Sequence, residues 1–226
     1  MINEKTGSTP YVYVFLSFIA ITSLLVYKGV QTQAMGFYPD IAIHIFLLFI
    51  LYVSRKALQL RPSTYLLVAF AMLLHDFGIF GWYNVSPVPM QWDHITHLFG
   101  GLSVAVLFFD FFKRWMTAKA KIRTIWLIAA VFFASLGMGA LVEVNEFWGY
   151  LKLGEGEGMF MFGPGDSWPG VASDIDNMNF VGGGWINEGW DLTFNIIGIL
   201  AGIVFCVFRD IVKINHSKNN HSAVKR

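Results

Sequence analysis

The chain consists of long apolar stretches separated by short polar connections. Six stretches approach the roughly 20 mostly apolar residues that a membrane-crossing helix needs, and they cover residues 11–30, 39–53, 63–82, 93–112, 125–146 and 188–208. The second is short. The first would also suit a cleavable signal peptide, but its leader balances Lys5 with Glu4 and its apolar core is long, which favours an uncleaved anchor. The pattern predicts an all-α fold, a polytopic membrane bundle of about six transmembrane helices.

The composition of the 226 residues excludes several other classes of protein. Charged residues make up 14% of the chain, against about 25% in soluble domains, and the 55% share of hydrophobic residues also excludes intrinsic disorder. A net charge of +1 excludes a protein that binds nucleic acid by bulk electrostatics. The single cysteine, Cys206, excludes an intrachain disulfide framework and a cysteine-rich metal site.

The positions of lysine and arginine predict the orientation. With six crossings, 13 of the 16 basic residues fall on one side, in the connections that hold Arg55 and Arg114 and after the last apolar stretch. Basic residues concentrate in cytoplasmic loops, so both termini are expected in the cytoplasm. Twelve of the 15 acidic residues and four of the six histidines lie toward the outer side. Acidic residues contribute little to topology, so this bias needs another explanation.

The chain is expected to form one transmembrane domain over residues 1–214, followed by a polar, frayed cytoplasmic tail over 215–226. Residues 151–187 form a long outer connection that is rich in Gly and Trp. Connections of this length are commonly functional or disordered. The aromatic residues favour an ordered cap over the outer membrane face.

The fourth apolar stretch begins with a segment that suits metal binding or acid–base chemistry. Asp93 and His97 are four residues apart and share a helix face, and His94 follows Asp93 directly. An Asp and two His in five residues supply metal ligands, or a base and the group that orients it. Taken alone, the segment favours the simpler interpretation of an N-capping Asp beside interfacial histidines.

The fifth stretch ends with two carboxylates. Glu143 and Glu146 share a helix face, and Glu143 follows directly on a long apolar run. A carboxylate in contact with lipid is costly, so Glu143 is expected to point into the bundle. Gly137 and Gly139 would allow another helix to approach closely.

The sixth stretch begins with a polar stripe. Glu188, Asp191 and Asn195 follow one another at intervals of three and four residues, and Gly198 and Gly202 continue the stripe as a packing face. Acidic residues in a first turn also suit the helix dipole. That explanation does not reach Asn195, which lies two turns into the helix.

Together these segments bring carboxylates and histidines from several helices to one membrane face. The second and third stretches add Asp40 with His44, and the adjacent pair His75 and Asp76, and no basic residue inside these stretches neutralises the acids. Clustered acids repel one another and take up protons unless a cation relieves them. Carboxylates with histidine suit zinc, manganese or iron. A proton-sharing carboxylate network and a purely structural polar core are the competing outcomes.

The predicted site is defined by its residues. The predicted metal ligands are Asp93, His94, His97, Glu143, Glu146 and Asp191. The predicted catalytic groups are Glu143, Glu146 and Asp93. The predicted supporting residues are Asn195 and Glu188.

The order of these motifs resembles a known family. Asp-His-x-x-His at 93–97, Glu-x-x-Glu at 143–146 and Trp-Asp-x-x-x-Asn-x-x-Gly at 190–198 look like the YjdF-type bacterial inner-membrane proteins. They are similar, more distantly, to the VanZ-like proteins, although His94 stands where those have Lys and Glu146 where they have Gln. The resemblance implies a bacterial inner-membrane location, and the link of the VanZ group with glycopeptide resistance suggests envelope lipids or peptidoglycan precursors.

Three functions remain open on the sequence. The first is a metal-dependent membrane enzyme with an outward-facing site that acts on a lipid or lipid-linked envelope substrate. The second is a transporter or ion-binding protein that uses the acids as a relay. It has no detectable repeat, and Asp110 is the main ionisable residue in the cytoplasmic half. The third is an accessory subunit whose outer connection binds a protein partner.

Overall fold

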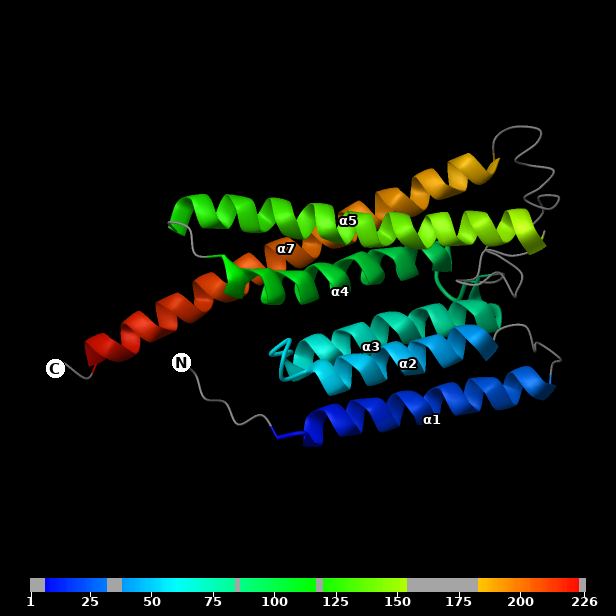
Figure 1. Ribbon diagram of the computed structural model, residues 1–226, viewed down its shortest axis with the longest axis horizontal. Coiled ribbons are helices and arrows are strands. Elements are labelled where there is room, and N and C mark those ends of the chain that lie inside the picture. The colour runs from blue at the N-terminus through cyan, green and yellow to red at the C-terminus, as the bar shows by residue number, and fades with distance from the viewer. Residues whose placement is uncertain (1–6, 32–37, 84–85, 117–119, 154–182, 224–226) are drawn as a thin grey trace.

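The structure, a computed structural model, describes residues 7–31, 38–83, 86–116, 120–153 and 183–223 (Figure 1). This part of the chain is helical and contains no strand. The helices are α1 (Thr9–Gln31), α2 (Tyr38–Ser54), α3 (Pro62–Phe77), the π-helical turn η2 (Gly78–Trp82), α4 (Trp92–Trp115), α5 (Ala120–Leu153) and α7 (Gly183–Ala223). Five spans in them are long and apolar enough to cross a membrane, and the apolar part of α2 is shorter. The predicted all-α polytopic bundle is therefore confirmed.

Two helices extend further than their apolar stretches predict. Helix α5 continues to Leu153, and α7 runs from Gly183 to Ala223. The predicted tail is thus helical as far as residue 223, because no Gly or Pro follows Gly202 to end α7. The predicted cap over 151–187 lies mostly outside the described residues, which resume at 183.

The third predicted helix is interrupted before its end. Helix α3 ends at Phe77, and η2 follows with the backbone of Gly81 at φ +130°, a conformation that favours glycine. A Cβ atom on Gly78 would overlap the ring of Tyr83. The wide turn and the missing side chain together let Tyr83 fold back, so that its hydroxyl lies 2.6 Å from Nδ1 of His75.

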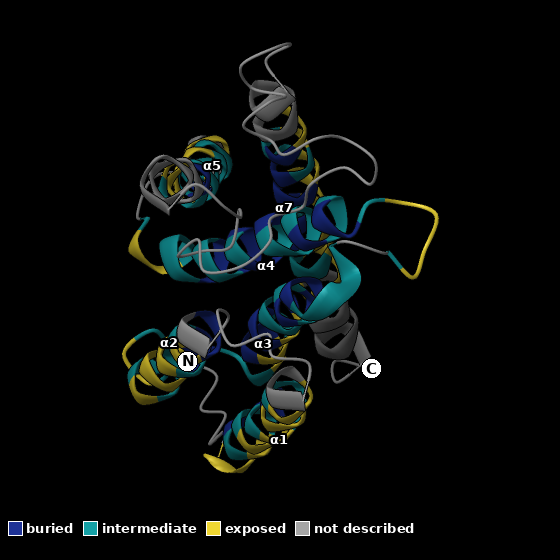
Figure 2. Cartoon of the chain, turned by 90° about the vertical axis from the view of Figure 1, so that its right-hand side faces the viewer, coloured by how far each residue is buried: buried dark blue, intermediate teal, exposed yellow. Residues whose placement is uncertain are grey.

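The helices form two groups that meet at α3 and α4. Helices α1, α2 and α3 pack together around Phe18, Leu48 and Tyr65, while α4, α5 and α7 pack around Phe109 and Ile199 (Figures 1 and 2). Exposed residues lie on the outer faces of the helices (Figure 2). Many of them are large and apolar, as lipid contact requires. We call the end of the bundle where α4 begins the acidic end, and the opposite end, where α4 stops and α5 begins, the basic end.

Small residues set the close crossing of α4 and α7. A Cβ atom on Gly198 would run into the backbone carbonyl of Leu98, one on Gly202 would meet the carbonyl of Leu102, and one on Gly101 would meet the carbonyl of Asn195. Backbones approach this closely only where side chains are absent. The packing face predicted for Gly198 and Gly202 of α7 is therefore present, and it packs against α4.

We expect Gly198→Leu to separate α4 from α7 and to lower the free energy of unfolding by about 1–3 kcal/mol or more, the usual cost of overpacking. Unfolding in mixed detergent micelles, followed by circular dichroism, measures this. Gly137→Leu is the matched control, because no atom of the described residues lies within 4 Å of the position that a Cβ on Gly137 would take. Equal stability of the two variants would contradict the close contact.

The open space beside Gly137 also corrects the expectation that Gly137 packs against a helix. Gly139 does so instead, against the side chain of Asn195.

The predicted orientation is tested with single cysteines on a Cys206→Ala background. Val88 is exposed at the acidic end and Lys56 is exposed near the basic end. If basic residues face the cytoplasm, a membrane-impermeant maleimide should label Val88→Cys in intact cells and Lys56→Cys only after permeabilisation. The reverse pattern would invert the bundle and place the acidic end in the cytoplasm.

Candidate functional site at the acidic end

Three helices bring polar side chains together at the acidic end. Helix α4 contributes Asp93 and His97, α5 contributes Glu143, and α7 contributes Asp191 and Asn195. The carboxylates and the amide are buried, and the His97 side chain is about 11% exposed. We call these five residues the carboxylate–histidine cluster.

His97 lies at the centre of the cluster and contacts three carboxylates. Its Nε2 lies 3.1 Å from Oδ1 of Asp93 and 3.8 Å from Oδ1 of Asp191. Its Nδ1 lies 3.4 Å from Oε1 of Glu143, and the same oxygen accepts a hydrogen bond of 3.1 Å from Nδ2 of Asn195. One imidazole nitrogen therefore faces two carboxylates, and the other faces a third carboxylate that is held by an amide.

The structure does not support an N-capping role for Asp93. Gln91 stands at the N-cap of α4 and makes no side-chain capping bond. Asp93 lies inside the first turn with its side chain buried and its Oδ1 in contact with His97. The Thr96 hydroxyl lies 2.7 Å from the backbone carbonyl oxygen of Asp93 and 3.3 Å from its Oδ1. The capping part of the simpler interpretation is therefore wrong.

The structure does not bring His94 into the cluster. Its ring stacks on Phe194 of α7, with centroids 4.3 Å apart and planes 11° from parallel, and it also lies near Trp190. His94 and His97 are three residues apart, but Phe194 and Trp190 hold the His94 ring on aromatic surface. Among the described residues, the group that suits a metal ion is Asp93, His97 and Asp191, and His94 is not in it. His94 as a ligand therefore stays a prediction, and the candidate group in the structure does not include it.

The side chains of two further predicted residues lie outside the described part of the chain. Glu146 is on the last turns of α5 and Glu188 on the first turns of α7, but only their helical backbone is described. Glu146 as a ligand or base, and Glu188 as a supporting group, stay predictions.

The spacing of the donor atoms fits one divalent cation. The ligand atoms of Asp93, His97 and Asp191 all lie within 4.8 Å of one another. Ligands bound at about 2.0–2.2 Å around a tetrahedral zinc ion lie roughly 3.4 Å from each other. Two of the separations, 3.1 and 3.8 Å, bracket that value. Two carboxylates with one imidazole suit zinc, manganese or iron.

A second polar cluster lies between α2 and α3 at the same end. Nδ1 of His44 is 2.6 Å from Oδ1 of Asp76, and both side chains are almost fully buried. The rings of His44 and His75 meet edge to face with centroids 5.2 Å apart. Asp40, which the sequence pairs with His44, is also buried here. Asp76 therefore fixes the ring of His44, and the Tyr83 hydroxyl fixes the ring of His75.

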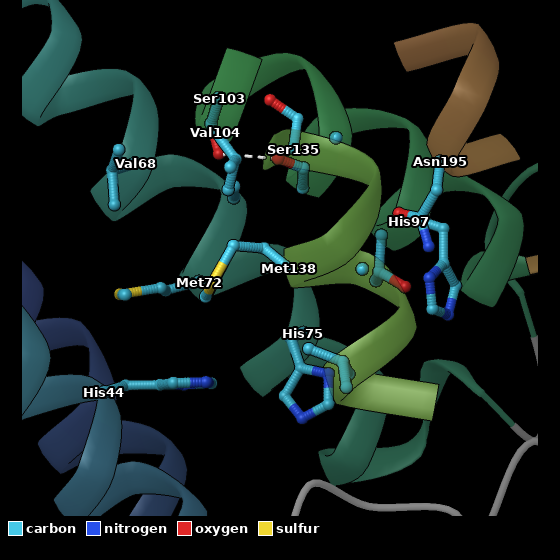
Figure 3. Close-up of a pocket in the computed structure, with 16 residues that line it drawn as sticks. His44, Val68, Met72, His75, His97, Ser103, Val104, Ser135, Met138 and Asn195 are labelled. Carbon is cyan, nitrogen blue, oxygen red and sulfur yellow. Dashed lines mark hydrogen bonds between the residues drawn. The ribbon is translucent and has the colours of Figure 1, made fainter. Parts of the chain in front are cut away.

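A cavity of about 200 Å³ lies between the two clusters (Figure 3). His44, His75 and His97 all line it, from α2, α3 and α4 respectively. Figure 3 shows His97 beside Asn195 on one side of this space and His44 on the other. Sequence reasoning did not find the cavity, because it depends on how far α3 and α5 stand apart on the surface of α4.

Comparison with known proteins gives the family. The sequence profile of the DUF2238 family, described as predicted membrane proteins, matches residues 11–210. The chain belongs to this family. It is also similar to the inner membrane protein YjdF of Escherichia coli (strain K12), with 24% identity over 166 residues that cover 67% of this chain and 77% of that protein. No solved structure matches the chain.

The DUF2238 match includes every residue of both clusters, and it confirms the YjdF-type resemblance that the motifs predict. An inner-membrane, multi-pass location follows from the apolar helices and the E. coli relative.

The basic end of this DUF2238 protein contains a buried ion-pair network that sequence reasoning missed. Asp110 of α4 is about 5% exposed, and its Oδ1 lies 2.6 Å from the guanidinium of Arg209 on α7 and 3.6 Å from that of Arg61 before α3. Thr64 donates a hydrogen bond of 3.2 Å to the other carboxylate oxygen. The signal in the sequence was a lone acid inside an apolar stretch, with arginines at the ends of two others.

Proposed function

We propose that the protein is a metal-dependent inner-membrane enzyme that acts on a lipid or lipid-linked envelope substrate. In this proposal Asp93, His97 and Asp191 hold one divalent cation. The observation that carries it is the geometry of His97, whose Nε2 faces both aspartates while Nδ1 faces Glu143. Histidines that bind metals usually donate their second N–H to a carboxylate, which fixes the tautomer and the ring orientation.

Glu143 then orients the ring and does not bind the metal. Its Oε1 contacts Nδ1 of His97 and accepts the hydrogen bond from Asn195. Asn195 thus takes the supporting role that the sequence predicts for it. A bound cation of this kind would polarise a carbonyl or phosphoryl oxygen and activate a water molecule. Glu146 remains the proposed base, since Glu143 is engaged with His97.

The substrate class rests on location and on resemblance. The cluster lies at the end of apolar helices, where lipid headgroups and lipid-linked precursors are the substrates at hand. The similarity of the motifs to VanZ-like proteins also favours an envelope substrate. If the acidic end faces outward, the site meets the outer leaflet.

A proton-sharing cluster is the alternative function, and one observation favours it. Both nitrogens of His97 face carboxylates, which is also the arrangement of an imidazolium ion between acids. Such a cluster would bind or relay protons without a metal.

Metal analysis of the purified protein distinguishes the metal-dependent enzyme from the proton-sharing cluster. The enzyme proposal expects one equivalent of zinc, manganese or iron at neutral pH. Treatment with EDTA should lower the thermal stability, and one ion should restore it. Absence of stoichiometric metal after each ion has been supplied would favour the proton-sharing cluster.

A second experiment tests catalysis. The metal-loaded protein is reconstituted in vesicles of E. coli polar lipid, and the lipids are followed by mass spectrometry. We expect a lipid species to be converted by the unaltered protein and not by Asp191→Asn. Bound metal without any conversion would contradict the enzymatic part and would favour the accessory-subunit interpretation.

A further inference from the structure

The cavity in Figure 3 lies inside the membrane-spanning part of the bundle. It has a volume of about 200 Å³ and is lined by residues of α2, α3, α4, α5 and α7. The lining residues of α3, α4, α5 and α7 belong to segments that are apolar enough to cross the membrane. On the α5 side it is bordered by Met138, a residue that is 45% exposed. A molecule that enters from this side comes from the hydrocarbon layer of the membrane.

The wall of the cavity is largely hydrocarbon. Val68, Ala71 and Met72 line it from α3, and Val104 and Met138 face them from α4 and α5 (Figure 3). Apolar cavities exclude water, and one of about 150 Å³ in another protein stays dry and binds benzene. The space here is therefore suited to a segment of hydrocarbon chain.

The polar part of the wall is formed by histidines with fixed rings. With Asp76 as a carboxylate, a neutral His44 donates through Nδ1 (2.6 Å), so its Nε2 carries no proton and can only accept. With the Tyr83 hydroxyl donating to Nδ1 of His75 (2.6 Å), the imidazole proton is on Nε2, which is buried and has no hydrogen-bond partner among the described residues. A buried polar atom of this kind is costly unless a ligand satisfies it.

We propose that the cavity binds one acyl chain of a membrane lipid, with an ester oxygen of that lipid accepting a hydrogen bond from Nε2 of His75. The inference rests on the proposed function and names its substrate class, because His97 belongs both to the cavity wall and to the carboxylate–histidine cluster. An ester at the histidine wall lies beside the proposed cation site, and its hydrocarbon chain occupies the space lined by Val68, Met72 and Val104.

Gly100 offers a variant that places a side chain at the cavity. It lines the cavity, and a Cβ there would meet no atom of the described residues within 4 Å apart from its chain neighbours and its own helix backbone. Gly137 is equally open but does not line the cavity. Gly100→Phe and Gly137→Phe are therefore a matched pair with the same change in mass, hydrophobicity and helix propensity.

The test uses photocrosslinking in vesicles. The probe is a phosphatidylethanolamine with a diazirine in one ester-linked acyl chain, and labelled residues are mapped by mass spectrometry. Label at Ala71 and Met72 reports the cavity, and label at the exposed Leu141 reports bulk lipid. We expect Gly100→Phe to lower the ratio of cavity to bulk label by about tenfold, equivalent to a few displaced methylene groups, and Gly137→Phe to leave it unchanged.

Two results would overturn the inference. One is label confined to exposed residues in the unaltered protein. The other is a cavity label that persists in Gly100→Phe. An ether-linked probe with the same diazirine tests the histidine contact, since it lacks the carbonyl oxygen, and equal labelling by both probes would remove the ester from the proposal.

Metal content, measured on the same samples, separates this inference from the proposed function. We expect Asp191→Asn to lose the metal and to keep the cavity label. Cavity label that depends on Gly100 in a protein that binds no metal would leave the lipid site standing and refute the metal-dependent enzyme. Stoichiometric metal without cavity label would refute the lipid site and leave the metal site standing.

Discussion

We expect His97→Gln to abolish stoichiometric binding of a divalent metal, whereas His94→Gln retains it. The two histidines are three residues apart on the same helix, so the variants make the same chemical change within one helical turn. Only His97 places a nitrogen within 3.8 Å of both Asp93 and Asp191. His94 instead stacks on Phe194. His97→Gln removes the one nitrogen donor of the proposed three-ligand cation site.

The measurement is elemental analysis of the two purified variants beside the unaltered protein, with melting curves recorded before and after EDTA. His94→Gln should still lose stability when EDTA is added. His97→Gln should not respond, since it has no metal to lose. Loss of metal from both variants would restore His94 to the ligand set, and retention by both would move the site elsewhere.

Glu143→Gln should have an intermediate effect on the same assay. Glu143 contacts Nδ1 of His97 and not the nitrogen that faces the aspartates. Replacing the carboxylate that orients a metal-bound histidine typically weakens metal affinity by about 10–100-fold without abolishing binding. Titration of the metal-free variant measures this shift. Complete loss of binding would make Glu143 a ligand, as the sequence alone suggests.

The fold was predictable because it follows from the hydrophobic pattern. A chain in lipid must satisfy its backbone hydrogen bonds within each segment, so long apolar stretches form helices. Local backbone geometry was less predictable. The turn at Gly81 depends on a positive φ that glycine permits but does not require, and the extension of α7 to Ala223 depends on a polar sequence that merely lacks a helix breaker.

The clustering of the acidic residues was predictable for a related reason. The cost of exposing Asp93, Glu143 or Asp191 to lipid directs each of them into the bundle. Successive helices cross the membrane in opposite directions, so the start of α4, the end of α5 and the start of α7 lie at the same end of the bundle. The choice between His94 and His97 was not predictable. It depends on which side of α4 is covered by Phe194 of α7, a tertiary contact that no spacing within one helix encodes.

At the basic end, sequence reasoning missed the role of two arginines in a buried ion-pair network. Arg61 and Arg209 served in the sequence only as markers of the cytoplasmic side, although both guanidinium groups turn inward to Asp110. An arginine at the end of a helix can extend its long side chain either to water or to a buried carboxylate. The sequence contains the acid and the arginines but not the crossing of α4 and α7 that brings them together.

This network leads to the second large effect. We expect Arg209→Met to lower the free energy of unfolding by about 3–5 kcal/mol, the usual cost of removing one partner of a buried ion pair. The buried carboxylate of Asp110 would keep only the hydrogen bond from Thr64 and the more distant Arg61, at 3.2 and 3.6 Å. Equilibrium unfolding in mixed detergent micelles measures the loss.

Lys113→Met is the matched control for this variant. Lys113 pairs with Asp210 at 2.5 Å, but its side chain is 37% exposed, whereas that of Arg209 is 16% exposed. Solvent screens such a pair, and its removal should cost no more than about 1 kcal/mol. The double variant Asp110→Asn with Arg209→Met should recover much of the lost stability, since no buried charge is then left without its partner. If Arg209→Met and Lys113→Met have equal and small effects, Asp110 is neutral or solvated in the membrane, and the network does not join α4 to α7.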